Sequence, residues 1–342
     1  MNVGIVGLGK MGLLHAGILN SLPDVRVTAV TEKESLIANY IKSAFSNIKV
    51  YDDHEKMLRD EKLDLVYITT PISSHLPIAL SCIENEINFF VEKPLTKDLD
   101  ECRMLCNELK KHNIIHGVGY NRRFIDTFVK TKSLLESRVV GDITEVKSSM
   151  YVSNIFSKSS GWRSKKNISG GGVLQDFGSH LIDLLLWYFG PIDTVSGETK
   201  SVYSEVEDFA HMKLEFVNKI KAELDTSWSV KGYRLPEINI KIIGTNGTLL
   251  VSEDFIKIEL KESAEGSENT EKTIYKQSLN TGVLIDIGGP DYTKEDIHVI
   301  DCVRQNKQTL VNAFEASKTQ CVIQSMYDAA GDGKVKQVRY LD

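Results

Sequence analysis

The sequence predicts two domains: an α/β domain built on a doubly wound parallel sheet, then an α+β domain with a large open, mostly antiparallel sheet. Three observations support this fold class. A chain of 342 residues is too long for one ordinary compact domain. Over the first 120 or so residues, short apolar runs alternate with helical patterns, as in a parallel sheet covered by helices. Beyond that point, apolar and polar residues alternate with a period of two, typical of antiparallel strands.

The first domain is predicted to span residues 1–121. Its first helix should stop at Pro23. Crossovers between its parallel strands are expected to be right-handed. The expected strands are residues 3–6, 25–30, 65–69, 88–91 and 114–118, and the expected helices are residues 11–22, 35–45, 75–85 and 99–112.

The second domain is predicted to span residues 122–342. Its strands are expected within residues 143–152 and 194–260, where Asn246-Gly247 is a strong hairpin signal. Residues 157–172 and 261–271 are polar and predict loops. The expected helices, which should cover one face of the sheet, are residues 126–137, 173–189, 293–305 and 315–330.

Composition narrows the class of protein. The hydrophobic fraction is 42% and the charged fraction 26%, as in soluble globular proteins, and the net charge of −6 argues against a nucleic-acid partner. Apolar runs stay short of the ~18 to 20 residues of a membrane span, and the N-terminus lacks a signal-peptide pattern. The five cysteines are spaced as ordinary buried thiols, with no obvious metal set. We therefore expect a cytoplasmic protein without a metal site.

A glycine-rich loop follows the first predicted strand and opens the first helix. Its residues are Gly7, Leu8, Gly9, Lys10, Met11 and Gly12. In this context the glycines permit a tight turn, a close approach to pyrophosphate, and close packing of helix on strand. Glu32, twenty residues past the last glycine, can hydrogen-bond the ribose of NAD. Lys33 leaves NADP open, and a purely structural turn is the alternative.

Two further strand ends carry polar residues. Thr70, Pro71 and His75 follow one predicted strand, and Glu92 and Lys93 follow the next. Ligands of doubly wound sheets bind at the carboxyl ends of the strands, which makes these residues candidates for cofactor contact. A lysine beside a nicotinamide can also hydrogen-bond a reacting hydroxyl group. The alternatives are a helix start for the first group and a surface turn for the second.

A polar stripe lies in the apolar segment 169–183. On a helix, Asp176, His180 and Asp183 stand at positions i, i+4 and i+7 and share one face. Polar groups on an otherwise apolar helix are costly to bury without partners, and an aspartate can orient a histidine that titrates near neutrality. The stripe indicates either catalysis or a structural hydrogen-bonded network.

These motifs occur in one order: GLGKMG, TTPISSH, VEKPLT, GYNRRF and GGGVLQDFGSHLIDLLLWYFG. This combination resembles the glucose–fructose oxidoreductase / inositol dehydrogenase / MocA family over residues 1 to about 190. Farther on, the turn at residues 244–248 is similar to one common in the family. The acid after the second strand is Glu32 where aspartate is commoner, so the choice between NAD and NADP stays open.

The resemblance implies a Rossmann domain followed by an α/β domain whose sheet commonly forms a homodimer or homotetramer contact. It implies that Lys93, Asp176 and His180 surround the substrate carbon beside the nicotinamide. We expect His180, oriented by Asp176, to take a proton from a secondary alcohol of a sugar, cyclitol or nucleotide sugar. Lys93 would stabilise the charge on that oxygen while hydride leaves to the cofactor.

Substrate contacts are also expected from residues outside these motifs. The candidates are Tyr120, Asn121, Arg122, Trp162 and Arg163, with Asp176 and His180. Ion pairs at the domain boundary are an equal alternative for Arg122 and Arg123. Three other functions compete with the dehydrogenase: glycoside cleavage through transient oxidation, a non-catalytic NAD sensor, and an imine, enone or linear-tetrapyrrole reductase. The presence of Lys93, Asp176 and His180 argues against the last two.

Overall fold

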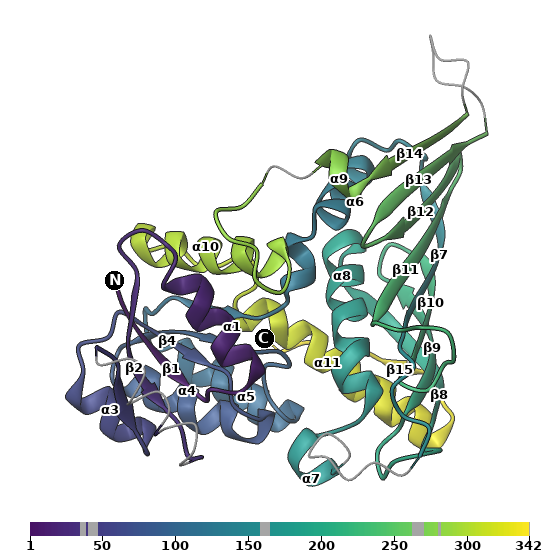
Figure 1. The fold of residues 1–342 in the computed structure, drawn as a ribbon. Coiled ribbons are helices and arrows are strands. Elements are labelled where there is room, and N and C mark those ends of the chain that lie inside the picture. Colours follow the sequence, from purple (N-terminus) through teal and green to yellow (C-terminus); the bar gives the residue numbers. More distant parts are fainter. Residues whose placement is uncertain (35–38, 40–46, 158–164, 262–269, 280–281, 342) are drawn as a thin grey trace. The chain divides into compact units, whose positions relative to one another are not determined.

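The computed structural model describes residues 1–34, 39, 47–157, 165–261, 270–279 and 282–341. The chain forms two compact units (Figure 1). The first unit comprises residues 1–121 and 282–317, and the second comprises residues 122–281 and 318–342.

The first unit contains a six-stranded parallel sheet in the order β3-β2-β1-β4-β5-β6. This is the doubly wound arrangement, in which the strand order reverses beside β1. The strands are β1 (Asn2–Val6), β2 (Arg26–Thr31), β3 (Lys49–Tyr51), β4 (Leu65–Ile68), β5 (Asn88–Val91) and β6 (His116–Val118). The helices before residue 121 are α1 (Lys10–Leu19), α3 (His54–Asp60), α4 (His75–Glu84) and α5 (Leu99–Leu109).

The sequence predicts five of these strands but misses β3 and the short helix α3. A strand of three residues with no fully buried position leaves little hydrophobic pattern to detect. The helix predicted at residues 35–45 lies outside the described residues.

The segment 282–317 packs with the first unit, whereas the sequence places it in the second domain. Its main element is α10 (Pro290–Gln305), from which Val299 and Ile300 enter the same core as Val3 and Phe90. The chain beyond α10 is also tied to the sheet, since the amide of Val118 donates to the carbonyl of Val311 at 2.8 Å. Hydrophobic burial against β1 and β5 thus brings this distant segment back.

The second unit is built on a nine-stranded sheet in the order β14-β13-β12-β11-β7-β10-β9-β8-β15. Neighbouring strands are antiparallel except for β7 and β10, which run parallel. The strands are β7 (Ile143–Tyr151), β8 (Ile192–Lys200), β9 (Phe209–Phe216), β10 (Lys221–Ser227), β11 (Glu237–Gly244), β12 (Gly247–Ser252), β13 (Phe255–Leu260), β14 (Glu271–Tyr275) and β15 (Lys336–Gln337).

Helices cover one face of this sheet. Figure 1 shows α6 (Asp126–Glu136) and α8 (Ser179–Phe189) along the same side. Accordingly, Val146, Ser148 and Met150 of β7 are buried while the residues between them are more exposed. The remaining helices are the short α7 (Lys166–Ser169) and α9 (Lys276–Leu279), and α11 (Ala313–Asp332), which runs from the first unit into the second.

The hairpin predicted at Asn246-Gly247 is confirmed, because β12 begins at Gly247 and pairs antiparallel with β11. The structure adds β14, which begins where the sequence predicts only a polar loop. Among the described residues, no helix combines the length and the apolar character needed to cross a bilayer.

Candidate active site

The glycine loop of the first unit joins β1 to α1 and uses its three glycines differently. Gly7 has a φ of +95°, a conformation that side chains disfavour. A Cβ atom on Gly12 would lie 2.0 Å from the carbonyl oxygen of Gly7, so only glycine lets the helix approach the strand. A Cβ atom on Gly9 would meet nothing within 4 Å. The space beside Gly9 is therefore open.

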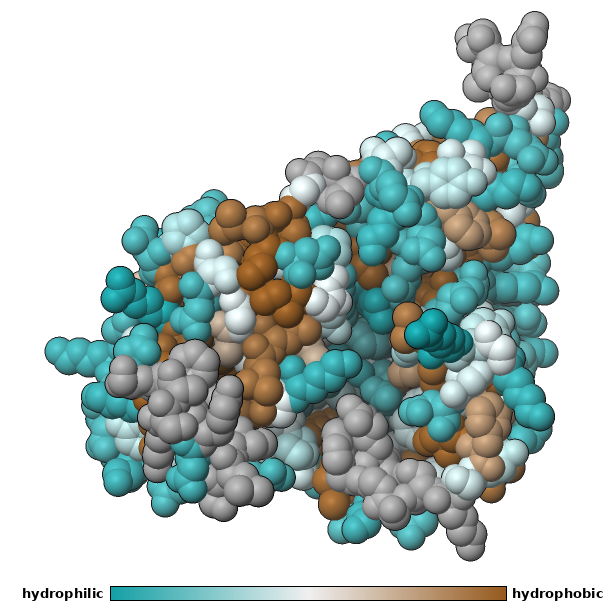
Figure 2. Space-filling view, viewed as in Figure 1, coloured by the Kyte–Doolittle hydropathy of each residue, from teal (hydrophilic) through white to brown (hydrophobic). Residues whose placement is uncertain are grey.

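The start of α1 offers hydrogen-bond donors beside this space. Gly9 is the N-cap residue of α1 and provides no side-chain cap, and the first amides of a helix lack partners within it. Such a helix start attracts phosphate. The helix surface is apolar farther along, where Leu13 is 51% exposed, and Figure 2 shows this apolar surface over α1. The loop therefore has the shape and the donors that a pyrophosphate needs.

Glu32 lies directly after β2 and closes one side of the loop. Its Oε2 atom accepts a hydrogen bond from the amide of Leu8 at 2.9 Å, and its Oε1 atom accepts from the amide of Glu34 at 2.8 Å. Lys33 is exposed beside it. A carboxylate thus stands next to the glycine loop, as binding of the ribose of NAD would require.

The end of β4 lies on the other side of the loop. The Thr69 hydroxyl donates to the carbonyl of Gly7 at 2.6 Å, which ties β4 to the loop. The Oγ1 atom of Thr70 is buried and has no hydrogen-bond partner among the described residues. A buried hydroxyl is costly without a partner, so Thr70 is suited to a polar ligand at this edge.

His75 connects two loops of this edge. Its Nδ1 and Nε2 atoms lie 3.0 Å from the carbonyl oxygens of Pro94 and Thr70, respectively, and its side chain is buried. Burial lowers the pKa of His75, although both carbonyls oppose this shift. These contacts let His75 support both loops, and the cofactor contact expected from the sequence stays a prediction.

Glu92 and Lys93 follow β5, the next strand of the sheet. The Oε2 atom of Glu92 accepts from the amide of Lys93 at 3.2 Å, and its Oε1 atom lies 3.1 Å from Nε2 of His15. Since β2, β1, β4 and β5 are neighbours and parallel, the predicted cofactor residues gather at one edge of the sheet. They include Glu32, the glycine loop, Thr70, Pro71, Glu92 and Lys93.

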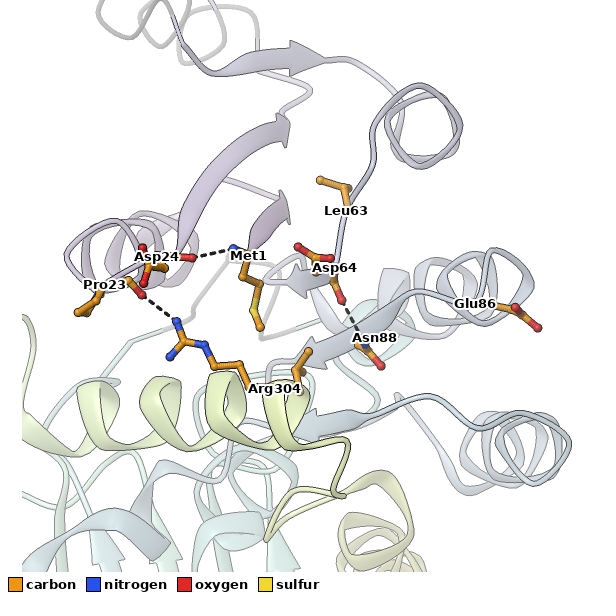
Figure 3. A pocket seen from close by; sticks show the side chains of 9 residues that line it. Met1, Pro23, Asp24, Leu63, Asp64, Glu86, Asn88 and Arg304 are labelled. Atoms are coloured by element: carbon orange, nitrogen blue, oxygen red, sulfur yellow. Dashed lines mark hydrogen bonds between the residues drawn. The ribbon is translucent and has the colours of Figure 1, made fainter.

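The first unit also has a depression of about 710 Å³ at the opposite edge, near the amino ends of β1, β4 and β5 (Figure 3). Its rim is held by hydrogen bonds from Arg304 to the carbonyl of Pro23 and from Asn88 to the carbonyl of Asp64. Ligands of doubly wound sheets bind at the carboxyl ends. This depression is therefore separate from the candidate cofactor site.

Asn121 is the last residue of segment 1–121, and its side chain forms a hydrogen bond within the first unit. It is buried, and its Nδ2 atom donates to Asp291 at 2.6 Å, which fastens the segment carrying α10. The ring of Tyr120 is also buried. The Asn121 side chain thus makes a structural hydrogen bond, and the substrate contact expected from the sequence stays a prediction.

Two arginines follow in the second unit, and both form ion pairs. Arg123 makes a bidentate pair with Asp183, with both contacts at 2.8 Å, and both side chains are at most 4% exposed. Arg122 pairs with Glu253 at 2.8 Å. Both arginines therefore form ion pairs within the second unit, and the substrate contact expected for Arg122 stays a prediction. The carboxylate of Asp183, the third residue of the predicted polar stripe, is therefore occupied by its ion pair with Arg123.

The other two members of the stripe lie around a π-helical turn, Leu174–Gly178, that leads into α8. Asp176 is half-buried within this turn and His180 is buried in the first turn of α8. The sequence predicts a regular α-helix here, which is wrong for these five residues. Isolated π turns interrupt α-helices frequently at functional sites.

A buried carboxylate anchors the start of this turn. The Oε1 atom of Glu207 accepts from the amides of Gly172 and Leu174, at 2.8 and 3.1 Å, and from the Tyr327 hydroxyl at 2.7 Å. Burial raises the pKa of Glu207, although these donors oppose the shift. Sequence reasoning missed Glu207, which lies between two strands without any motif around it. Trp162 and Arg163, predicted to contact substrate, lie outside the described residues.

Comparison with known proteins identifies the family. Residues 1–120 match the model of an oxidoreductase family with an NAD-binding Rossmann fold, and residues 128–250 match the GFO/IDH/MocA C-terminal domain. The chain belongs to the GFO/IDH/MocA family. It is therefore an oxidoreductase whose first domain is an NAD-binding Rossmann domain, as the motifs indicate.

Relatives within the GFO/IDH/MocA family include dehydrogenases. The scyllo-inositol 2-dehydrogenase (NAD(+)) of Bacillus subtilis is 25% identical over 324 residues, which cover 92% of this chain and 89% of the relative. Oxidoreductase P35 of Formosa agariphila is 29% identical over 208 residues, covering 57% of this chain and 62% of that protein. A solved levoglucosan dehydrogenase, in complex with NADH and levoglucosan, shares the fold with a TM-score of 0.90 at 20% identity, over the full length of both chains.

Proposed function

We propose that this GFO/IDH/MocA protein is an NAD(P)-dependent dehydrogenase of a secondary alcohol in a sugar, cyclitol or nucleotide sugar. The observation that carries the proposal is the open space beside Gly9, with the Glu32 carboxylate at the same edge of the sheet. The Thr70 hydroxyl, which has no hydrogen-bond partner within the described part of the chain, lies at this edge too. This edge fits a dinucleotide. The names of the inositol and levoglucosan dehydrogenases support a polyhydroxylated substrate.

The cofactor choice is proposed from Glu32. Its carboxylate is fixed by the Leu8 amide, where it can accept hydrogen bonds from ribose hydroxyls and repel a 2′-phosphate. NAD is therefore the expected cofactor, and the exposed Lys33 is the residue that would help NADP to bind. When bound, the nicotinamide supplies the hydride acceptor.

The protein's own residues would handle the proton. His180 takes the proton of the substrate hydroxyl, Asp176 orients His180, and Lys93 donates a hydrogen bond to the same oxygen as negative charge develops on it. Proton transfer to a positioned side chain typically contributes ~10²- to 10⁴-fold to the rate. The carbon–hydrogen bond breaks as the carbonyl forms, and the protonated His180 then returns its proton to solvent.

The decisive experiment is a panel of inositols, free sugars, nucleotide sugars and glycosides, each assayed with NAD and with NADP by absorbance of the reduced nicotinamide. Reduction of the cofactor by a free alcohol supports the dehydrogenase. Net cleavage of a glycoside without net reduction would instead favour hydrolysis through transient oxidation. Binding of NAD without turnover of any compound would favour a sensor.

The role of His180 is tested by His180→Ala. We expect turnover to fall by about 10²-fold or more, while the Kd for NAD changes less than threefold. His112→Ala is the matched control, since His112 lies beside a carboxylate, Glu108 at 3.5 Å, just beyond the carboxyl end of α5. Full turnover in His180→Ala would refute the role.

The family resemblance also leads us to propose a homodimer or homotetramer through the nine-stranded sheet. Its strands β7, β9 and β10 carry paired charges such as Lys147 with Glu223 and His211 with Asp225. Light scattering during gel filtration gives the mass in solution. A 38.3 kDa species at every concentration would overturn this proposal.

A further inference from the structure

A buried histidine on α1 lies between two carboxylates of the first unit. The His15 side chain is 0% exposed. Its Nδ1 atom lies 2.9 and 3.0 Å from the two carboxylate oxygens of Asp296 on α10, and its Nε2 atom lies 3.1 Å from Oε1 of Glu92. No motif of the sequence includes His15, and the mechanism proposed above does not use it.

This geometry favours the doubly protonated ring. A neutral imidazole has one N–H donor and one acceptor nitrogen, whereas carboxylates only accept. Both nitrogens of His15 face carboxylates, so only the imidazolium can donate to Glu92 and Asp296 together. Burial lowers the pKa of His15, but the two carboxylates outweigh burial and hold the pKa well above its usual value.

Other titratable groups surround the ring. The Tyr67 hydroxyl on β4 donates to Asp296 at 3.0 Å, and the ring of Tyr292 on α10 lies 6.2 Å from that of His15. Glu295, also on α10, is buried, and burial together with the nearby Glu92 raises its pKa well above the usual value. Burial also raises the pKa of Asp296, although its contacts with His15 and Tyr67 oppose this shift. The carboxyl groups of Glu92 and Asp296 are the ones within hydrogen-bond distance of the His15 ring.

Glu92 links this buried pair to the candidate active site. One of its oxygens faces His15, and the other accepts from the amide of Lys93 at 3.2 Å. Gly119 packs against this carboxylate, since a Cβ atom on Gly119 would lie 3.1 Å from Oε2 of Glu92. A chain of contacts thus runs from Asp296 through His15 and Glu92 to the backbone of Lys93.

We propose that His15 and Asp296 are positioning residues that fix the carboxylate of Glu92 and, through it, the backbone of Lys93. The role assigned to Lys93 rests on the proposed function, but the contacts that define the positioning pair do not. A buried carboxylate without a cation becomes costly, so loss of His15 frees Glu92 to move or to bind a proton.

The first test needs no substrate. In the cofactor-free protein, ¹⁵N NMR should show both ring nitrogens of His15 protonated at pH 7. His116 is the control within the same unit, because burial lowers its pKa to about 4 and its Nδ1 accepts from the amide of Ala313. A His15 ring with one unprotonated nitrogen at pH 7 would overturn the proposal.

The second test follows the amide of Lys93. In His15→Gln and in Asp296→Asn, the amide proton of Lys93 should shift upfield as its bond to Glu92 weakens. In His116→Gln it should keep its position. An unchanged Lys93 amide in both variants contradicts the positioning role. If either variant fails to fold, the protonation state of His15 in the unmodified protein still tests the proposal.

The third test uses turnover with whichever alcohol the panel identifies. His15→Gln should lower kcat at least tenfold with less than a threefold change in the Kd for NAD, whereas His116→Gln should leave both values unchanged. In a Lys93→Ala background, His15→Gln should change kcat less than twofold. Equal losses in both backgrounds would show that His15 acts without Lys93. Failure of the proposed function would leave both NMR results intact, so the two failures are distinguishable.

Discussion

The two glycine-rich segments of the protein look alike in sequence but differ in what surrounds them. In the first unit, a Cβ atom on Gly9 would meet nothing within 4 Å. In the second unit, a Cβ atom on Gly171 would lie 2.0 Å from the Tyr327 hydroxyl, and one on Gly172 would lie 1.9 Å from the carbonyl oxygen of Glu207. Gly9 leaves room for a ligand, whereas Gly171 and Gly172 leave room for the protein itself.

This difference teaches how to interpret a glycine near an active site. Glycine permits a close approach, but the approaching group can be a ligand or another part of the chain. In the second unit, the approaching groups are the Tyr327 hydroxyl at Gly171 and the Glu207 backbone at Gly172. The Glu207 side chain in turn accepts a hydrogen bond from the Gly172 amide. At Gly171 and Gly172, the space that a side chain would need is thus filled by the protein itself.

The largest effect is expected for Gly172→Ala. The added methyl group would collide with the backbone of Glu207, which cannot move aside as a flexible side chain can. We expect a loss of roughly 3 to 5 kcal/mol in the free energy of unfolding, measured with urea. Gly331→Ala is the control, because a Cβ atom on Gly331 meets nothing within 4 Å. Equal stability of the two variants would contradict the packing role.

A smaller effect, of a different kind, is expected for Gly9→Ala. Its backbone has a φ of −66°, which alanine tolerates, so the free energy of unfolding should change by less than about 1 kcal/mol. The new methyl group would occupy the space proposed for pyrophosphate. The Kd for NAD, measured by calorimetry, should rise at least tenfold, or by about 1.4 kcal/mol. Unchanged affinity would mean that the cofactor lies elsewhere.

The smallest effect concerns the pH dependence of stability. Burial raises the pKa of Glu207 in the folded protein above its ordinary value of 4.5. The stability contributed by this group is therefore full below pH 4.5 and is lost as the pH rises through the folded pKa. Glu207→Gln removes this titration, so stability should fall less from pH 4.5 towards neutrality. Glu237→Gln, exposed on β11, should keep the slope of the unmodified protein.

The alternation of strand and helix patterns over the first 120 residues is a local property of the sequence. It is enough to predict five strands of the parallel sheet, and with them the sheet edge at which Glu32, Thr70 and Glu92 lie. Glu32 and Glu92 follow directly on a strand and Thr70 follows after one residue, and strand ends can be identified from the hydrophobic pattern. The family assignment could be predicted for the same reason, since its motifs are short and continuous.

The remaining features depend on contacts between distant residues. Asp183 shares a helical face with His180 in the sequence pattern, yet its partner Arg123 lies 60 residues away. The π turn leads into α8, a helix that is apolar and buried on nearly every side, so no periodic pattern could reveal the turn. Likewise, no local signal tells that Asn121 bonds Asp291 or that Asp296 faces His15.

The return of residues 282–317 to the first unit also has a consequence for how the protein is made. A nascent chain that has released only residues 1–121 leaves uncovered the apolar side on which α10 packs, and β6 lacks its bond to Val311. Strands β7 to β14 of the second unit are all synthesised before α10 emerges from the ribosome. Within residues 1–342, the first unit is thus completed only after strands β7 to β14 of the second unit have been synthesised, and the apolar side on which α10 packs stays uncovered until then.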